Sequence, residues 1–231
     1  MIHKSPSTLA LVLGAIEHAA HAGGFQFGDG FSIPDNDPAG ASSSIHVGAI
    51  DGVMDTFGVR TLWPETVAAG GHAWVGDLAA TITYTPDAGG PSVSCDLFRR
   101  ISATSETSPG DSSDMRGGLF FTNYAVFQPR NIWDAAAAAG FNAPVGGGAF
   151  FPSTRDASFQ YQQLNFVSVF GLSVGSGTWT LNISDHNPGN NGRLVQWSIE
   201  YFIPAPSTAG LLVMLGAASM RRRRPTASMS L

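Results

Sequence analysis

Two segments of alternating apolar and polar residues near the C-terminus constrain the fold of this chain more than any other feature. They span residues 177–185 and 192–201, and their apolar members at every second position are Trp179, Leu181, Ile183, Val195, Trp197, Ile199 and Tyr201. A period of two predicts two strands, each with one buried face. Pro188-Gly189 and Asn191-Gly192 lie between them and favour a chain reversal. We therefore expect a closing hairpin, and because each aromatic side chain buries about 150–250 Å², we expect a second sheet to cover it.

The composition is that of a turn-rich β protein. The 231 residues, of which 43% are hydrophobic and 13% charged, include 28 glycines and 14 prolines. This length is compatible with one large domain or two small ones. Cys95 is the single cysteine, so the sequence excludes an internal disulfide and a multi-cysteine metal site.

The charge of the central region argues against a nucleic-acid partner. Residues 23–204 contain seven basic residues, all arginine, and sixteen acidic residues. Such a region repels phosphate backbones.

The N-terminus has the features of a secretory signal peptide over residues 1–22. Lys4 precedes an apolar run at residues 9–16, and Ala20 and Ala22 form a small-residue site that predicts cleavage after Ala22. A retained amphipathic helix is the alternative interpretation. The glycine-rich residues 23–30 are expected to form a flexible lead-in to a folded region at 31–203.

The C-terminal residues 204–231 have the pattern of a sorting segment. An apolar run follows Pro204 and Pro206, and it is shorter than the roughly 20 residues that a permanent membrane helix needs. The run ends at a basic cluster expected to remain cytoplasmic, which consists of Arg221, Arg222, Arg223 and Arg224.

This tail resembles the PEP-CTERM sorting signal of Gram-negative bacteria, although Ala205 replaces the glutamate of the family's Pro-Glu-Pro. The resemblance implies an exosortase-type processing peptidase as a partner and contact with the membrane before processing. A plain C-terminal membrane anchor is the alternative.

Short alternating segments separated by turns continue through the folded region. We predict an all-β, jelly-roll-like β-sandwich. The extended segments are expected at residues 45–50, 59–63, 66–69, 74–84, 93–97, 119–127 and 159–170. Residues 74–84 and 93–97 should pair as a hairpin with a long loop. Residues 102–118 have the composition of a loop, and the alanine-rich residues 132–139 predict the one helix.

Three separated motifs in this region resemble the P domain, the β-sandwich that follows the catalytic domain in kexin-like and furin-like proprotein convertases. The opening resemblance lies at residues 32–36 and the central one at residues 72–78, before Pro86. The third lies in residues 177–198. The motif residues, to which we assign structural roles, are His72, Trp74, Gly76, Asp77, Leu78, Gly177, Trp179, Asp185 and Trp197.

The resemblance implies an accessory domain that accompanies and stabilises a subtilisin-like protease. Because the motifs extend over residues 31–202, we expect a free-standing P domain rather than a protease. The Gly110-Asp111-Ser112-Ser113 segment is similar to a serine-protease nucleophile turn. None of His46, His72 and His186 lies in a recognisable catalytic context, so we expect a solvated loop.

His72 has two interpretations, a ligand-binding residue or a hydrogen-bonded corner of the fold, and the second is favoured because buried polar groups need partners. Weak candidates for calcium ligands are Asp35, Asp37, Asp77 and Asp185. The sequence has no contiguous calcium loop, and it indicates no other cofactor.

These observations favour a non-enzymatic β-sandwich that is exported to the cell envelope, cell surface or extracellular matrix and binds a protein or polysaccharide ligand. The alternative is an accessory domain acting in trans on a secreted subtilisin-like serine protease.

Overall fold

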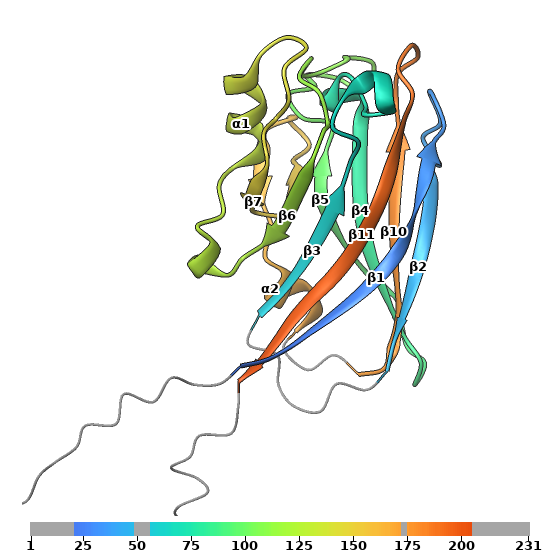
Figure 1. The fold of residues 1–231 in the computed structure, drawn as a ribbon, viewed down its shortest axis with the longest axis vertical. Helices are drawn as coiled ribbons and strands as arrows, with labels where there is room; N and C mark the ends of the chain where they lie inside the picture. The colour runs from blue at the N-terminus through green and yellow to red at the C-terminus, as the bar shows by residue number, and fades with distance from the viewer. Residues whose placement is uncertain (1–20, 49–55, 172–174, 205–231) are drawn as a thin grey trace, which may run out of the picture. The chain divides into compact units, whose positions relative to one another are not determined.

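Two antiparallel-rich β-sheets face each other in the computed structural model, which describes residues 21–48, 56–171 and 175–204 (Figure 1). One sheet has the strand order β1-β11-β3-β6-β7 and the other has the order β2-β10-β4-β5. A small third sheet pairs β8 with β9. This arrangement confirms the predicted all-β, jelly-roll-like sandwich. In the described part of the chain, no helix is long and apolar enough to cross a membrane.

The four-stranded sheet is antiparallel throughout. It consists of β2 (Ala41–Val47), β10 (Gly177–Asp185), β4 (Leu78–Pro86) and β5 (Val93–Arg99). Strand β10 is central and pairs with both β2 and β4. The predicted hairpin is confirmed, because β4 pairs with β5 across residues 87–92.

The five-stranded sheet consists of β1 (His21–Ile33), β11 (Gly192–Pro204), β3 (Thr56–Leu62), β6 (Gly118–Thr122) and β7 (Gly148–Phe150). Strand β7 pairs with β6 in parallel, whereas β3 pairs antiparallel with β11 and β6. The small sheet pairs β8 (Ser153–Arg155) with β9 (Tyr161–Gln163).

The expected closing hairpin is wrong, although both of its strands exist. Strand β10 lies in the sheet with β2 and β4, and β11 lies in the sheet with β1 and β3 (Figure 1). The linker therefore carries the chain from one sheet to the other. Trp179 on β10 and Trp197 on β11 are 2% and 1% exposed, so both indoles point into the core as predicted.

Aromatic rings fill much of the space between the sheets. Trp179 stacks on Phe57 of β3 at a centroid distance of 4.7 Å and lies 4.8 Å from Tyr84 of β4. Phe57 also meets Phe166 edge-to-face at 5.1 Å. These contacts join strands of both sheets, and aromatic pairs contribute about 0.5–1.5 kcal/mol each beyond their buried area.

The predicted helix at 132–139 is confirmed as α1 (Ile132–Ala139). The side chain of Asn131 caps it by accepting a hydrogen bond from Trp133 N at 2.8 Å. The predicted strand at 159–170 is only partly correct, because α2 (Phe166–Phe170) follows β9. Asn165 caps α2 in the same way, through bonds from the backbone N–H groups of Val167 and Ser168.

Three further predictions differ from the structure. Residues 23–30 belong to β1 rather than to a flexible lead-in, since they pair with β11. The expected extended segment at 66–69 contains a 3₁₀ turn (Val67–Ala69) instead, capped by the Thr66 side chain. The strand expected at 119–127 ends at Thr122, and a second 3₁₀ turn (Ala125–Phe127) follows.

The proposed signal peptide and sorting segment fall almost entirely on residues outside the described ones. Ala20, Pro206 and the basic cluster of residues 221–224 lie there, whereas Ala22 lies in β1 and Pro204 ends β11.

Candidate functional site at the polar end of the sandwich

The segment 72–78, which precedes β4, is held against the loop at residues 111–115. His72 and Met115 exchange two backbone hydrogen bonds, of 3.2 and 2.7 Å. A third 3₁₀ turn (Val75–Asp77) follows, so the extended segment predicted at 74–84 begins only at Leu78. In this turn Gly76 N donates to Asp111 O at 3.0 Å. A Cβ on Gly76 would lie 2.3 Å from Asp111 N, so this close approach requires glycine.

The side chains of His72 and Asp185 form a buried pair at the end of the sandwich where β4 begins and β10 ends, which we call the polar end. His72 Nε2 lies 3.0 Å from Asp185 Oδ2, and both side chains are fully buried. The other carboxylate oxygen of Asp185 accepts a hydrogen bond from Asn187 N at 3.0 Å. In the described part of the structure, His72 Nδ1 has no partner. The pair ties the segment before β4 to the end of β10.

Asp77 is the second buried carboxylate of this end. It accepts a hydrogen bond from Asn187 Nδ2 at 2.8 Å, and its backbone oxygen accepts from His186 N at 2.9 Å. Burial raises the pKa of Asp77, and this effect is opposed by the hydrogen bond from Asn187. Asp77, at the end of the 3₁₀ turn that precedes β4, thus fixes the turn after β10.

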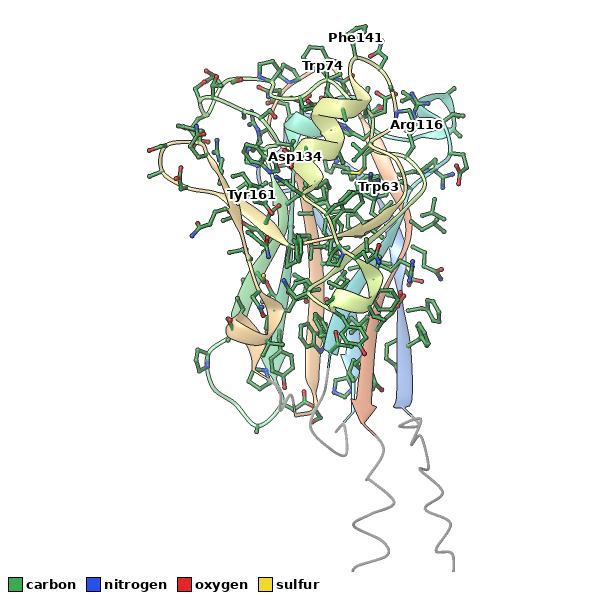
Figure 2. All side chains as sticks on the ribbon, turned by 90° about the vertical axis from the view of Figure 1, so that its left-hand side faces the viewer. Trp63, Trp74, Arg116, Asp134, Phe141 and Tyr161 are labelled. Atoms are coloured by element: carbon green, nitrogen blue, oxygen red, sulfur yellow. The ribbon has the colours of Figure 1, made fainter. Side chains whose placement is uncertain are left out.

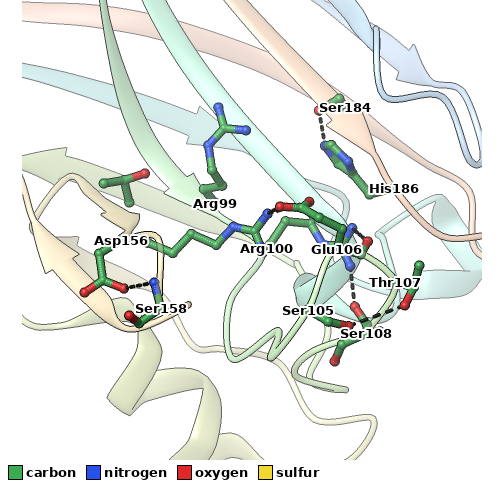
Figure 3. Close-up of polar contacts among 12 residues, drawn as sticks. Arg99, Arg100, Ser105, Glu106, Thr107, Ser108, Asp156, Ser158, Ser184 and His186 are labelled. Atoms are coloured by element: carbon green, nitrogen blue, oxygen red, sulfur yellow. Dashed lines mark hydrogen bonds and ion pairs between the residues drawn. The ribbon is translucent and has the colours of Figure 1, made fainter.

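Arg100 is a fully buried arginine that the sequence analysis did not single out. Its Nε donates to Gly76 O at 2.9 Å, its Nη1 to Glu106 O at 3.4 Å, and its Nη2 to Ser108 O. The guanidinium therefore holds the loop at residues 102–110 against the turn that contains Gly76 (Figure 3). Burial lowers the pKa of Arg100, and nearby Asp77 opposes that change.

Charged side chains surround this buried centre. Arg155 Nη2 contacts both carboxylate oxygens of Glu106 at 2.7 Å, and Arg99 pairs with Asp96 at 2.7 Å. His186 Nε2 lies 3.0 Å from Ser184 Oγ (Figure 3). The pKa of His186 is lowered by burial first and then by the positive charges of the neighbouring arginines.

The structure does not bring the residues of a serine-protease triad together. Among the described residues, the side-chain hydrogen bonds of the histidines go to Asp87, Asp185 and Ser184, and none goes to Ser112. Ser112 is half-buried in the loop, and its carbonyl accepts from Asn142 N at 3.1 Å. The buried His72–Asp185 pair has no access to solvent. A nucleophile needs a base within hydrogen-bond reach, and this loop does not supply one to Ser112.

The four aspartates predicted as weak calcium candidates all accept hydrogen bonds from turn residues within the fold. Asp35 accepts from Gly189 N at 2.9 Å and Asp37 from Ala39 N at 3.0 Å. Asp77 and Asp185 bind the turn at Asn187. Within residues 21–48, 56–171 and 175–204, no three His, Cys, Asp or Glu side chains are arranged to hold a metal ion.

The remaining motif residues lie in or next to the core. Leu78 is fully buried, and a Cβ on Gly177 would lie 2.4 Å from the ring of Tyr84. Trp74 is half-buried with a left-handed backbone (φ 64°), at the same end of the molecule as Phe141 (Figure 2). Trp197 Nε1 donates to Ser43 Oγ at 2.6 Å and so joins β11 to β2.

Comparison with known proteins gives one match. The family model of the Proprotein convertase P-domain matches residues 150–201, which include β8, β9, α2, β10 and most of β11. The motif residues Gly177, Trp179, Asp185 and Trp197 lie in this segment, whereas His72 and Asp77 lie outside it. Searches of curated proteins and of solved structures gave no match. This segment is thus similar to a non-catalytic accessory β-sandwich domain.

Proposed function

We propose that this chain is a non-catalytic β-sandwich module, exported and then sorted to the cell envelope, cell surface or extracellular matrix. The main support for this proposal is that the polar motif residues are buried and hydrogen bond within the fold. His72, Asp77 and Asp185 are at most 1% exposed and hydrogen bond within the fold. Buried residues of this kind stabilise the fold, and the exposed faces of the sandwich are available for binding.

The two ends of the sequence support export and sorting. Residues 1–22 have the basic start, apolar run and small-residue site of a signal peptide. Residues 204–231 combine two prolines, a short apolar run and four arginines. An exosortase-type peptidase would cut this tail, which contacts the membrane before processing.

Mass spectrometry of both termini after cell fractionation tests the proposal. We expect the mature chain in the envelope or medium, beginning at Gly23 and lacking the basic cluster of residues 221–224. A variant with these four arginines changed to glutamine should accumulate unprocessed. A chain found in the cytoplasm with both termini intact would contradict export.

The family match favours a second candidate, an accessory domain that acts in trans on a secreted subtilisin-like serine protease. Its support is the similarity of residues 150–201 to the P domain. Affinity capture from culture medium distinguishes the two candidates. Co-purification of a serine protease, with higher thermal resistance of its activity when this chain is present, is expected only for the second.

A further inference from the structure

The outer face of the four-stranded sheet is a regular array of hydroxyl groups. Three rows of residues cross this sheet from β2 through β10 and β4 towards β5; two of them end on β5, and the third ends at Ser92, just before β5, through its hydrogen bond with Thr85. Nine of the twelve positions are Ser or Thr. The rows are His46, Thr178, Thr85 and Ser92; Ser44, Thr180, Thr83 and Ser94; and Ser42, Asn182, Thr81 and Asp96.

Neighbouring hydroxyls in these rows are hydrogen bonded in pairs. Ser44 Oγ lies 2.8 Å from Thr180 Oγ1, Thr83 Oγ1 lies 2.8 Å from Ser94 Oγ, and the Thr85–Ser92 pair is 2.7 Å apart. A hydroxyl has one hydrogen and two lone pairs, so each pair keeps one hydrogen and several lone pairs for a partner. Along the two rows that contain these pairs, the face can therefore both donate and accept.

This face carries almost no net charge. Typical designed surfaces have about 25–35% Lys, Arg, Glu and Asp, whereas Asp96 is the one acidic residue among the twelve and no Lys or Arg is present. Asp96 is paired with Arg99, and His46 at another corner contacts Asp87 at 2.8 Å. Such a face offers little attraction to a charged polymer of either sign.

We infer that this hydroxyl array binds a neutral polysaccharide whose chains lie extended on a flat surface. The partner's chemistry follows from complementarity, since sugar hydroxyls also donate and accept and carry no charge. The inference rests on the proposed function as a binding module and names its ligand class and binding face.

The geometry of the array selects a repetitive and extended partner. Hydroxyls recur about every 4.8 Å across strands and about every 6.6–6.8 Å along them. The twelve positions include no Phe, Tyr or Trp side chain on which a single sugar could stack. Binding must then come from many weak hydrogen bonds that form together. Only a partner with a regularly repeating surface can form them all at once.

Retention of the purified full-length chain on microcrystalline cellulose tests the inference. The wild-type chain should be retained to the same extent at low salt and at 1 M NaCl, because no ion pair is involved. The variant Thr83→Val/Thr85→Val/Thr180→Val removes three hydroxyls and keeps β-favouring side chains. We expect its apparent affinity to fall about tenfold or more.

Two further variants separate loss of the array from loss of the fold. Thr83→Lys puts a cation at the centre of the array and should also abolish retention, with the thermal transition preserved. Thr104→Val changes an exposed threonine in the loop after β5 and should leave retention unchanged.

Three results would overturn the inference. They are absence of wild-type retention on cellulose, equal retention of the array variants, and retention only on charged polymers such as alginate or chitosan. Inhibition of ice recrystallisation that the array variants lose, without retention on cellulose, would assign the face to ice instead. Because the assay uses purified protein, its failure leaves the proposal of export and sorting intact.

Discussion

His72 Nε2 lies 3.0 Å from Asp185 Oδ2 in a fully buried pair that joins residues 113 positions apart in the sequence. His72 precedes β4, and Asp185 ends β10, its central neighbour. The pair therefore fixes the relative position of these strands at their ends. In a domain without disulfides, such contacts between distant segments contribute a large part of the preference for one arrangement of the strands.

Removing one member of this pair should destabilise the fold strongly. His72→Ala leaves the Asp185 carboxylate without its side-chain partner in a buried position, which costs about 3–5 kcal/mol. Urea unfolding followed by tryptophan fluorescence would measure the loss. The double variant His72→Ala/Asp185→Ala should lose less than the sum of the single variants. Additive losses would show that the two side chains do not interact.

Arg100 should be irreplaceable by lysine. A lysine has the same charge but a single ammonium group, and it cannot supply the planar fork that reaches Gly76 O, Glu106 O and Ser108 O. We expect Arg100→Lys to lower the free energy of unfolding by about 2 kcal/mol and to speed hydrogen exchange at residues 102–110. Arg193→Lys, at an exposed arginine, is the matched control and should change stability by less than about 0.5 kcal/mol.

The sequence predicted the two C-terminal strands and the pairing of β4 with β5, but not that β10 and β11 lie in different sheets. Alternation over residues 177–201 correctly placed Trp179 and Trp197 in the core. A period of two determines only which face is buried, and it is the same for a hairpin and for a connection between facing sheets. The pairing is decided by contacts with strands that are distant in the sequence: β10 pairs with β2 and β4, and β11 pairs with β3.

Two other differences have local physical causes. The glycine-rich residues 23–30 form a strand because Tyr201 and Trp197 fill the space over Gly24 and Gly28, as the close approach of those rings shows. Phe166, Val169 and Phe170 have the i, i+3, i+4 spacing of a helix and follow a capping asparagine. That signal was present in the sequence but was outweighed by the β-prone composition around it.

At the polar end, the sequence indicated His72, Asp77 and Asp185 but not Arg100 or Asn187. The first three were indicated by a family resemblance in the sequence, and of these only Asp185 lies in the segment that the family model matches. Arg100 and Asn187 act through backbone carbonyls and through Asp77, and these partners come together only in the folded chain. No spacing rule identifies a side chain whose partners are backbone carbonyls.

Gly76 should tolerate no side chain. A Cβ there would lie 2.3 Å from Asp111 N and 2.4 Å from Pro109 O, and backbone atoms cannot move away cheaply. Gly76→Ala should therefore destabilise the protein by about 1–3 kcal/mol, measured as a lower denaturation midpoint. Gly48→Ala is the control, because no atom lies within 4 Å of its added Cβ. Equal effects of the two substitutions would contradict the close approach at Gly76.

Cys95 should be inert in the folded protein. The side chain is buried in the core, and burial raises the pKa of its thiol to about 12. The reactive thiolate is thus a negligible fraction at pH 8. A chromogenic disulfide reagent should label Cys95 only after unfolding in denaturant, at the rate of global unfolding. Rapid labelling of the native chain would show that β5 opens independently.

The stability of the protein should fall as the pH is lowered below about 6.5, in part because of His186. Burial and the neighbouring arginines lower the pKa of this imidazole below its ordinary value of 6.5. Between those two pKa values the unfolded chain binds a proton that the folded chain does not, so the free energy of unfolding decreases as pH falls. His186→Gln removes this proton uptake while keeping a polar side chain beside Ser184. The difference in thermal midpoint between pH 7.5 and pH 5 should therefore be smaller for the variant than for the wild-type protein. An unchanged difference would show that folding does not lower the pKa of His186.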